Sequence, residues 1–301
     1  MNMKVDLCGV TLNNPVMTAS GTFGSGAEYA EFVDLNKLGA VVTKGVANVP
    51  WPGNPTPRVA EVYGGMLNAV GLQNPGIDLF VERDIPFLKQ FDTKIMVNVC
   101  GHSTEEYIEV VERLRDQPVD LLEINISCPN VKEGGIAFGQ DPKAVEAITK
   151  EMKKHAAQPV IMKLSPNVTD ITEMARAAEA GGADGLSLIN TITGMKIDIN
   201  RQKFVLANKT GGMSGPAIHP VACRIVYQTA QAVRLPIVGM GGIMNAEDAI
   251  EMILAGATAV SVGTANFTNP HVTEEIVAGI RDYMERYQVA DIRDLVGAVH
   301  E

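Results

Sequence analysis

The chain has 301 residues, of which 46% are hydrophobic, and its 25 lysines and arginines against 35 aspartates and glutamates give a formal net charge of −10. This composition excludes a disordered chain, and the acidic balance argues against a nucleic-acid partner. No apolar run approaches the ~20 residues of a membrane span, and the first residues lack a secretory signal pattern. We therefore expect a cytoplasmic protein that binds no membrane.

Eight short apolar segments are predicted to be strands. Most are continuous apolar runs rather than alternating ones, which is typical of strands buried on both faces of a parallel sheet. They cover residues 15–20, 40–44, 94–100, 120–127, 159–165, 185–190, 236–240 and 259–263.

Amphipathic stretches between these segments are predicted to be helices. Ser103 with Glu106 forms a capping box, Asp141 followed by Pro142 is an N-cap and first-turn pair, and a Gly-Gly pair at 181–182 is a stop signal. The expected helices cover residues 104–116, 141–156, 169–180, 219–233, 245–255 and 273–287.

The alternation of eight strands with helices predicts a (β/α)8 TIM barrel of the α/β class, for which roughly 250 residues suffice. The alternative is a doubly wound open sheet, but the segment after the first strand, TASGTFGSG, lacks the GxGxxG fingerprint. No linker or composition shift divides the chain, so we expect one domain over residues 1–301. Two long insertions, 46–92 and 191–216, are expected to cover an active site over the C-terminal face or to bind a partner.

Polar or small residues follow every predicted strand. Because the carboxyl ends of barrel strands share one face, we expect these residues to form one polar pocket. A single Asn at such a place is more often a loop cap, but the full set in register favours a binding site. The set comprises Ser20, Gly21, Thr43, Lys44, Gly45, Asn98, Asn125, Ser127, Cys128, Lys163, Asn190, Thr191, Gly241, Gly242, Gly263 and Thr264.

The last two strands end in Gly241–Gly242 and Gly263–Thr264, where barrels commonly bind phosphate through backbone N–H groups. Two ordinary tight turns are the alternative interpretation. Lys44 and Lys163 lie in otherwise apolar strands, and a buried ammonium needs an anionic partner. A phosphorylated cofactor with an anionic substrate would supply one.

Cysteine and histidine are the remaining candidates for chemistry. Cys128 at the pocket rim is a candidate base or nucleophile, although a lone cysteine is more often structural, as we expect for Cys8, Cys100 and Cys223. The five histidines show no metal-ligand spacing, and the cysteines form no cluster, so we expect no metal site.

At these residues the sequence resembles the class 1 dihydroorotate dehydrogenases along nearly its whole length. NISCPNVKEGG and GLQNPG are most similar to subclass 1B, whose catalytic subunit passes electrons to NAD through a second subunit. The matching segments are TASGTFGSG, TKG, GNPTPR, NAVGLQNPG, NVCG, EINISCPNVKEGG, MKLSPN, INT, GGMSGPAI, VGMGGI and SVGTANF.

The resemblance implies a barrel that holds FMN, oxidises dihydroorotate to orotate in pyrimidine biosynthesis, and uses Cys128 as the catalytic base. The implied FMN contacts are Ser20, Lys44, Gly45, Asn98, Asn125, Lys163, Ile189, Gly215, Gly241, Gly242, Gly263 and Thr264. The implied substrate contacts are Lys44, Asn68, Ala69, Val70, Gly71, Leu72, Asn125, Asn190 and Thr191.

The same resemblance implies a partner, because this chain has no cysteine cluster for an iron–sulfur centre and no GxGxxG for FAD or NAD. The expected partner is an iron–sulfur flavoprotein carrying FAD and a 2Fe-2S cluster, in a heterotetramer of two catalytic and two electron-transfer subunits. Three alternatives stay open at this point. They are the fumarate-reducing subclass 1A, another flavin-barrel dihydropyrimidine or dihydrouridine oxidoreductase, and a barrel that binds a metabolite without catalysis.

Overall fold

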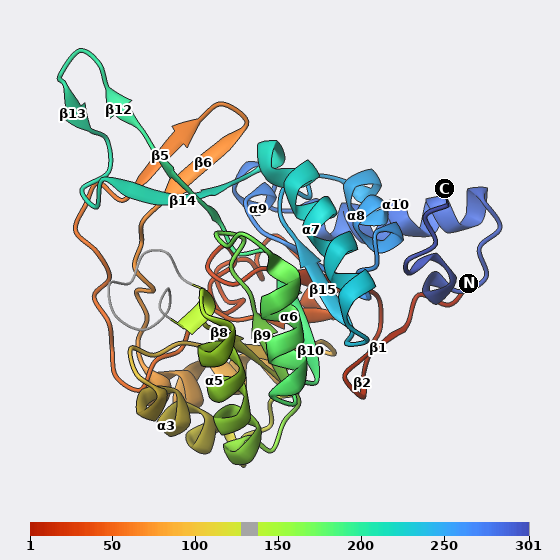
Figure 1. Cartoon of the computed structure of the whole chain (residues 1–301). Coiled ribbons are helices and arrows are strands. Elements are labelled where there is room, and N and C mark those ends of the chain that lie inside the picture. Colours follow the sequence, from red (N-terminus) through yellow and green to blue (C-terminus); the bar gives the residue numbers. More distant parts are fainter. Residues whose placement is uncertain (128–137, 301) are drawn as a thin grey trace.

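The computed structural model describes residues 1–127 and 138–300 and contains a closed barrel of eight parallel strands (Figure 1). The last barrel strand pairs with the first, with Val260 opposite Val16, so the sheet has no free edge. This confirms the predicted (β/α)8 barrel. In order around the barrel the strands are β3 (Val16–Thr18), β4 (Ala40–Val42), β7 (Lys94–Val99), β8 (Leu121–Asn125), β9 (Val160–Lys163), β10 (Gly185–Leu188), β15 (Ile237–Met240) and β16 (Ala259–Val262).

Each predicted strand is present, and all but β15, which ends at Met240 as predicted, are shorter at the carboxyl end. Helices surround the barrel, and two of them begin at the N-caps that the sequence predicts: Ser103 accepts from the Glu106 N–H and Asp141 from the Lys143 N–H. The longer helices are α3 (Thr104–Leu114), α5 (Pro142–His155), α6 (Ile171–Ala180), α7 (His219–Ala232), α8 (Ala246–Leu254) and α10 (Val272–Arg286). Shorter ones are α1 (Ile77–Leu79), α2 (Ile85–Leu88) and α9 (Ala265–Thr268), with helical turns at Leu35–Lys37, Phe80–Asp84, Pro216–Ile218 and Ile292–Leu295.

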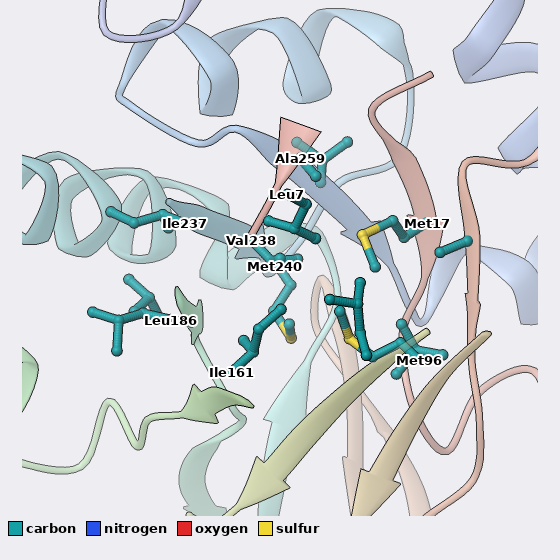
Figure 2. Close-up of a cluster of buried hydrophobic side chains, with 14 of the residues drawn as sticks. Leu7, Met17, Met96, Ile161, Leu186, Ile237, Val238, Met240 and Ala259 are labelled. Atoms are coloured by element: carbon teal, nitrogen blue, oxygen red, sulfur yellow. The ribbon is translucent and has the colours of Figure 1, made fainter. Parts of the chain in front are cut away.

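The core is formed by the barrel strands and the helices packed on them, and Figure 2 shows apolar side chains of several strands gathered together with Leu7. Leu7 belongs to β1 (Val5–Leu7), which pairs with β2 (Val10–Leu12) in a hairpin. A Cβ placed on Gly185, the first residue of β10, would lie 2.7 Å from the Cys8 Sγ of this hairpin. The hairpin therefore closes the amino end of the barrel and leaves the carboxyl end for the site.

The two insertions pair with each other in a second, antiparallel sheet, which the sequence did not lead us to expect. Its strand order is β11 (Ile192–Met195), β14 (Thr210–Ser214), β6 (Gly65–Asn68) and β5 (Val59–Val62). Asn68 of the first insertion lies opposite Gly212 of the second. A further hairpin, β12 (Ile197–Asp198) with β13 (Lys203–Phe204), projects from this sheet (Figure 1).

In the two described stretches, none of the helices is both long enough and apolar enough to cross a membrane.

Candidate functional site

A cavity of about 1190 Å³, including its open mouth, lies between the carboxyl ends of the barrel strands and the insertion sheet. Strand-end residues such as Ser20, Asn125 and Gly263 line it together with Asn68 and Ser214 of the insertion sheet. The barrel thus supplies one wall and the paired insertions another, and both insertions contribute to the site.

Lys163 supplies a buried positive charge to the cavity and is only 5% exposed. Its Nζ lies 3.3 Å from Oε2 of Glu123, which also accepts a hydrogen bond from Asn98 Nδ2. Oε1 of Glu123 accepts from the Ser187 hydroxyl at 2.7 Å. These contacts satisfy both carboxylate oxygens in a place where an unpaired charge would be costly.

Amide side chains meet beside this ion pair. Asn190 Nδ2 donates to the Ser127 hydroxyl at 2.8 Å and lies 3.4 Å from Asn125 Oδ1. Asn125 Nδ2 in turn donates to Asn98 Oδ1 at 3.4 Å, and the backbone oxygen of Asn125 accepts from the Tyr107 hydroxyl at 2.7 Å. Because Asn125 and Asn190 both line the cavity, these carboxamides offer donors and acceptors to a polar ring.

The glycine turn, Gly241–Gly242, follows β15, the neighbour of β10 in the barrel, and also lines the cavity. Both residues have positive φ, +128° and +69°, and a Cβ on Gly242 would lie 2.7 Å from His219 Cβ and 2.9 Å from the Gly215 oxygen. Only glycine fits here without strain, which lets the backbone line the cavity directly. Nearby, the hydroxyls of Thr264 and Ser214 lie 2.7 Å apart and join β16 to the insertion sheet.

The structure brings most of the predicted site residues together. All the described ones line the cavity except Thr43, Gly45, Asn98, Ser127 and Ala69, which are set back from it. Asn98 is fully buried behind Asn125, and Ala69 packs against Leu67 and Leu206. Cys128, the predicted base, lies outside the described residues.

Three polar residues of this region were missed in the sequence. Glu123 could have been noticed as a single acid inside the apolar run LLEIN. Ser261 is 1% exposed, lines the cavity, and its hydroxyl has no hydrogen-bond partner in the described part of the chain. Ser214 lies in a strand that only the pairing of two distant insertions creates, so no local signal marks it.

Within residues 1–127 and 138–300, one group of potential metal ligands gathers outside the cavity: His219, Asp248 and Glu251. His219 Nε2 lies 3.0 Å from Glu251 Oε2, and Asp248 accepts from the backbone N–H of Met244 at 2.8 Å. The ligand atoms are therefore already engaged in a contact between His219 and Glu251 and in a helix cap.

Known proteins are similar to this chain along nearly their whole length. A protein from Lachnoclostridium phytofermentans is 71% identical over 299 residues, covering 99% of this chain and 100% of that one. One from Alkaliphilus metalliredigens is 64% identical and covers 99% of each chain. Both carry the name dihydroorotate dehydrogenase B (NAD(+)), catalytic subunit.

Among solved structures, a DHODH from Eimeria tenella in complex with ferulenol superimposes with a TM-score of 0.82. It is 22% identical and covers 99% of this chain and 88% of that one, so it supports the fold alone. The family model described as dihydroorotate dehydrogenase matches residues 2–284. With that match and relatives of this identity along their full length, the chain belongs to the dihydroorotate dehydrogenase family.

Proposed function

We propose that this chain oxidises dihydroorotate to orotate with FMN as its cofactor, and that the electrons reach NAD through a second subunit. The observation that carries the proposal is one cavity that joins a buried ammonium, a set of carboxamides and a backbone glycine turn. The names of the relatives, which specify a catalytic subunit and NAD, agree with it.

The residues of the cavity fit a flavin mononucleotide. Its lining includes the carboxamides of Asn125 and Asn190, which suit a polar ring, and glycine turns, whose backbone N–H groups suit a phosphate. Gly241, Gly242 and Gly263 would hold the phosphate through backbone N–H groups, with the Thr264 hydroxyl beside them. The buried hydroxyl of Ser261, which has no hydrogen-bond partner among the described residues, is a further group that a bound ligand would satisfy.

Lys163 would face the flavin ring and stabilise negative charge that develops there on reduction. Lys44, which also lines the cavity, would place a second positive charge between cofactor and substrate. When bound, FMN supplies the acceptor for the hydride that leaves C6 of the substrate.

The substrate ring alternates carbonyl and N–H groups around its edge, and a carboxamide both donates and accepts. Asn68, Asn125 and Asn190 would therefore bind the ring, and Thr191 and residues 70–72, which line the cavity, would complete the contacts. Leaving one such partner unpaired in a buried site costs roughly 1–3 kcal/mol. The anionic substrate carboxylate explains why cations belong in this pocket.

Oxidation also requires removal of a proton from C5. We assign this step to Cys128 as a thiolate, on the strength of the family resemblance of NISCPN. A thiol is suitable because its ordinary pKa of about 8.5 is close enough to neutrality for proton transfer. Water would be kept from the reacting atoms by the insertion sheet above the cavity.

The second subunit of this proposal is an iron–sulfur flavoprotein that carries FAD and a 2Fe-2S cluster. Two catalytic and two electron-transfer subunits would form a heterotetramer in the cytoplasm. Native mass measurement of the co-expressed complex and cell fractionation test these two points.

The central experiment is anaerobic titration of the purified chain with dihydroorotate, followed by flavin absorbance. We expect a yellow protein that binds one FMN and is bleached by dihydroorotate but not by dihydrouracil, which lacks the carboxylate. A colourless protein that takes up no FMN would reject the proposal. Equal bleaching by dihydrouracil would instead favour a different dihydropyrimidine oxidoreductase.

Oxidation of the reduced chain by candidate acceptors tests the route of the electrons. We expect NAD to be reduced only after the iron–sulfur flavoprotein subunit is added, and fumarate to be reduced poorly. Efficient reduction of fumarate by the isolated chain would contradict the assignment of NAD as final acceptor.

A further inference from the structure

Glu123 is a fully buried acid in the middle of the apolar strand β8, with 0% of its surface exposed. Its carboxylate contacts side chains from three other barrel strands: Asn98 of β7, Lys163 of β9 and Ser187 of β10. Three strands thus converge on one carboxylate.

This carboxylate lies one layer behind the cavity surface. Lys163 lines the cavity, whereas Glu123 and Asn98 do not. Asn98 Oδ1 accepts from Asn125 Nδ2 at 3.4 Å, and Asn125 also lines the cavity. Glu123 therefore lies behind two of the polar groups that face the cavity, one directly and one through Asn98.

Stability alone is a poor explanation for this arrangement. A buried ion pair is often no more stabilising than apolar residues of the same volume, because desolvation of both charges offsets their attraction. Removing one partner is costly, however, since it leaves the other charge buried and uncompensated. The pair is thus better explained by the effect of Glu123 on the charge and the position of the Lys163 side chain.

We propose that Glu123 is a positioning residue, the counter-ion that holds the Lys163 ammonium charged and aimed into the cavity toward the flavin. Without this carboxylate the 5% exposed ammonium would lose its charge or turn away, and either change removes positive charge from the flavin ring. This inference rests on the proposed function, because it assumes that FMN occupies the cavity.

The experiment compares Glu123→Gln, Lys163→Met and the double variant with the wild-type holoenzyme. Gln keeps the shape, an acceptor for Asn98 and a donor for Ser187, but removes the charge. The readouts are the flavin midpoint potential and the FMN dissociation constant. Ser187→Ala is the control, because it removes one hydrogen bond to Glu123 and keeps its charge and its contact with Lys163.

We expect Lys163→Met to shift the midpoint potential to more negative values and to weaken FMN binding by on the order of tenfold. Glu123→Gln is expected to shift the potential in the same direction, and the double variant to shift it no further than Lys163→Met alone. Ser187→Ala should keep the wild-type potential.

An unchanged or more positive potential in Glu123→Gln, or additive shifts in the double variant, would overturn the proposal. A Ser187→Ala shift as large as that of Glu123→Gln would do so too, since it would indicate a packing effect. If Glu123→Gln does not fold, the double variant should, because it contains no unpaired buried charge; failure of both would also overturn it. A wild-type chain that binds no FMN would instead reject the proposed function itself.

Discussion

The imidazole of His219, at the start of α7, lies with Nδ1 3.0 Å from the carbonyl oxygen of Gly241 and with Nε2 3.0 Å from the Glu251 carboxylate. The ring therefore ties the glycine turn to α8. A side chain that is 7% exposed and outside the cavity lining thus fixes backbone that lines the cavity.

Replacing His219 with Ala should loosen the glycine turn and weaken FMN binding. The lost hydrogen bonds are expected to raise the FMN dissociation constant by on the order of tenfold, because the Gly241 carbonyl loses its partner. Equilibrium dialysis or flavin fluorescence measures this change. His271→Ala, at an exposed helix start, is the control and should bind FMN as the wild type does. Equal affinity in both variants would contradict the role of His219.

Replacing Gly242 with Ala tests the turn itself. The added Cβ would lie 2.7 Å from His219 Cβ and 2.9 Å from the Gly215 oxygen, at a φ of +69°. We expect FMN binding to be lost, with lowered thermal stability. Gly9→Ala is a matched control, because Gly9 has φ +83° but nothing within 4 Å of its added Cβ. It should cost about 1 kcal/mol of stability and leave FMN affinity unchanged. Loss of FMN from both variants would mean that backbone strain alone is responsible.

The barrel could be predicted from the sequence because its signals are local. The strands are continuous apolar runs, and the N-caps at Ser103 and Asp141 form the expected hydrogen bonds. The strand ends gather on one face by topology, so the positions of Lys163 and Asn190 at the cavity followed from strand order alone.

The insertion sheet could not be predicted in this way, because Asn68 and Gly212 pair across 144 positions of sequence. Strands as short as β12 carry no periodic signal. Glu123 was missed for a related reason: its partners lie on three other strands, and only the closed barrel brings them within hydrogen-bond distance. The role of Cys128 stays a prediction from family resemblance.

Cys128→Ala tests that prediction directly. Loss of a general base should lower turnover with dihydroorotate by a factor on the order of 10²–10⁴ while FMN stays bound. Steady-state and stopped-flow reduction of the flavin measure the effect. Cys223→Ala, on the outer helix α7, serves as the control and should keep wild-type turnover. Near-normal turnover of Cys128→Ala would remove this thiol from the mechanism.

The Cys8 thiol provides a prediction on pH. Burial, with Asp184 and Asp6 nearby, raises its pKa above the ordinary thiol value, to about 12. The folded state thus favours the neutral thiol. The stability of the folded state that depends on a neutral Cys8 thiol is fully present below pH 9 and is lost as the pH rises toward 12. Alkylation at pH 8, followed by mass spectrometry, should modify Cys8 at least about tenfold more slowly in the native chain than in urea. Equal rates would show that burial does not suppress the thiolate.

Asn190→Ala separates substrate binding from cofactor binding. Asn190 Nδ2 holds the Ser127 hydroxyl at 2.8 Å, and the Asn190 Oδ1 accepts from the Thr191 N–H at 2.9 Å. Loss of the Asn190 carboxamide removes a contact to the substrate ring and loosens Ser127 and Thr191. Orotate should therefore bind about 10- to 100-fold more weakly, corresponding to roughly 1–3 kcal/mol. FMN content should stay the same, because the glycine turn is untouched. Orotate titration of flavin absorbance measures this, with exposed Asn200→Ala as the control. Unchanged orotate affinity, or loss of FMN together with orotate, would contradict the assignment of Asn190 to the substrate.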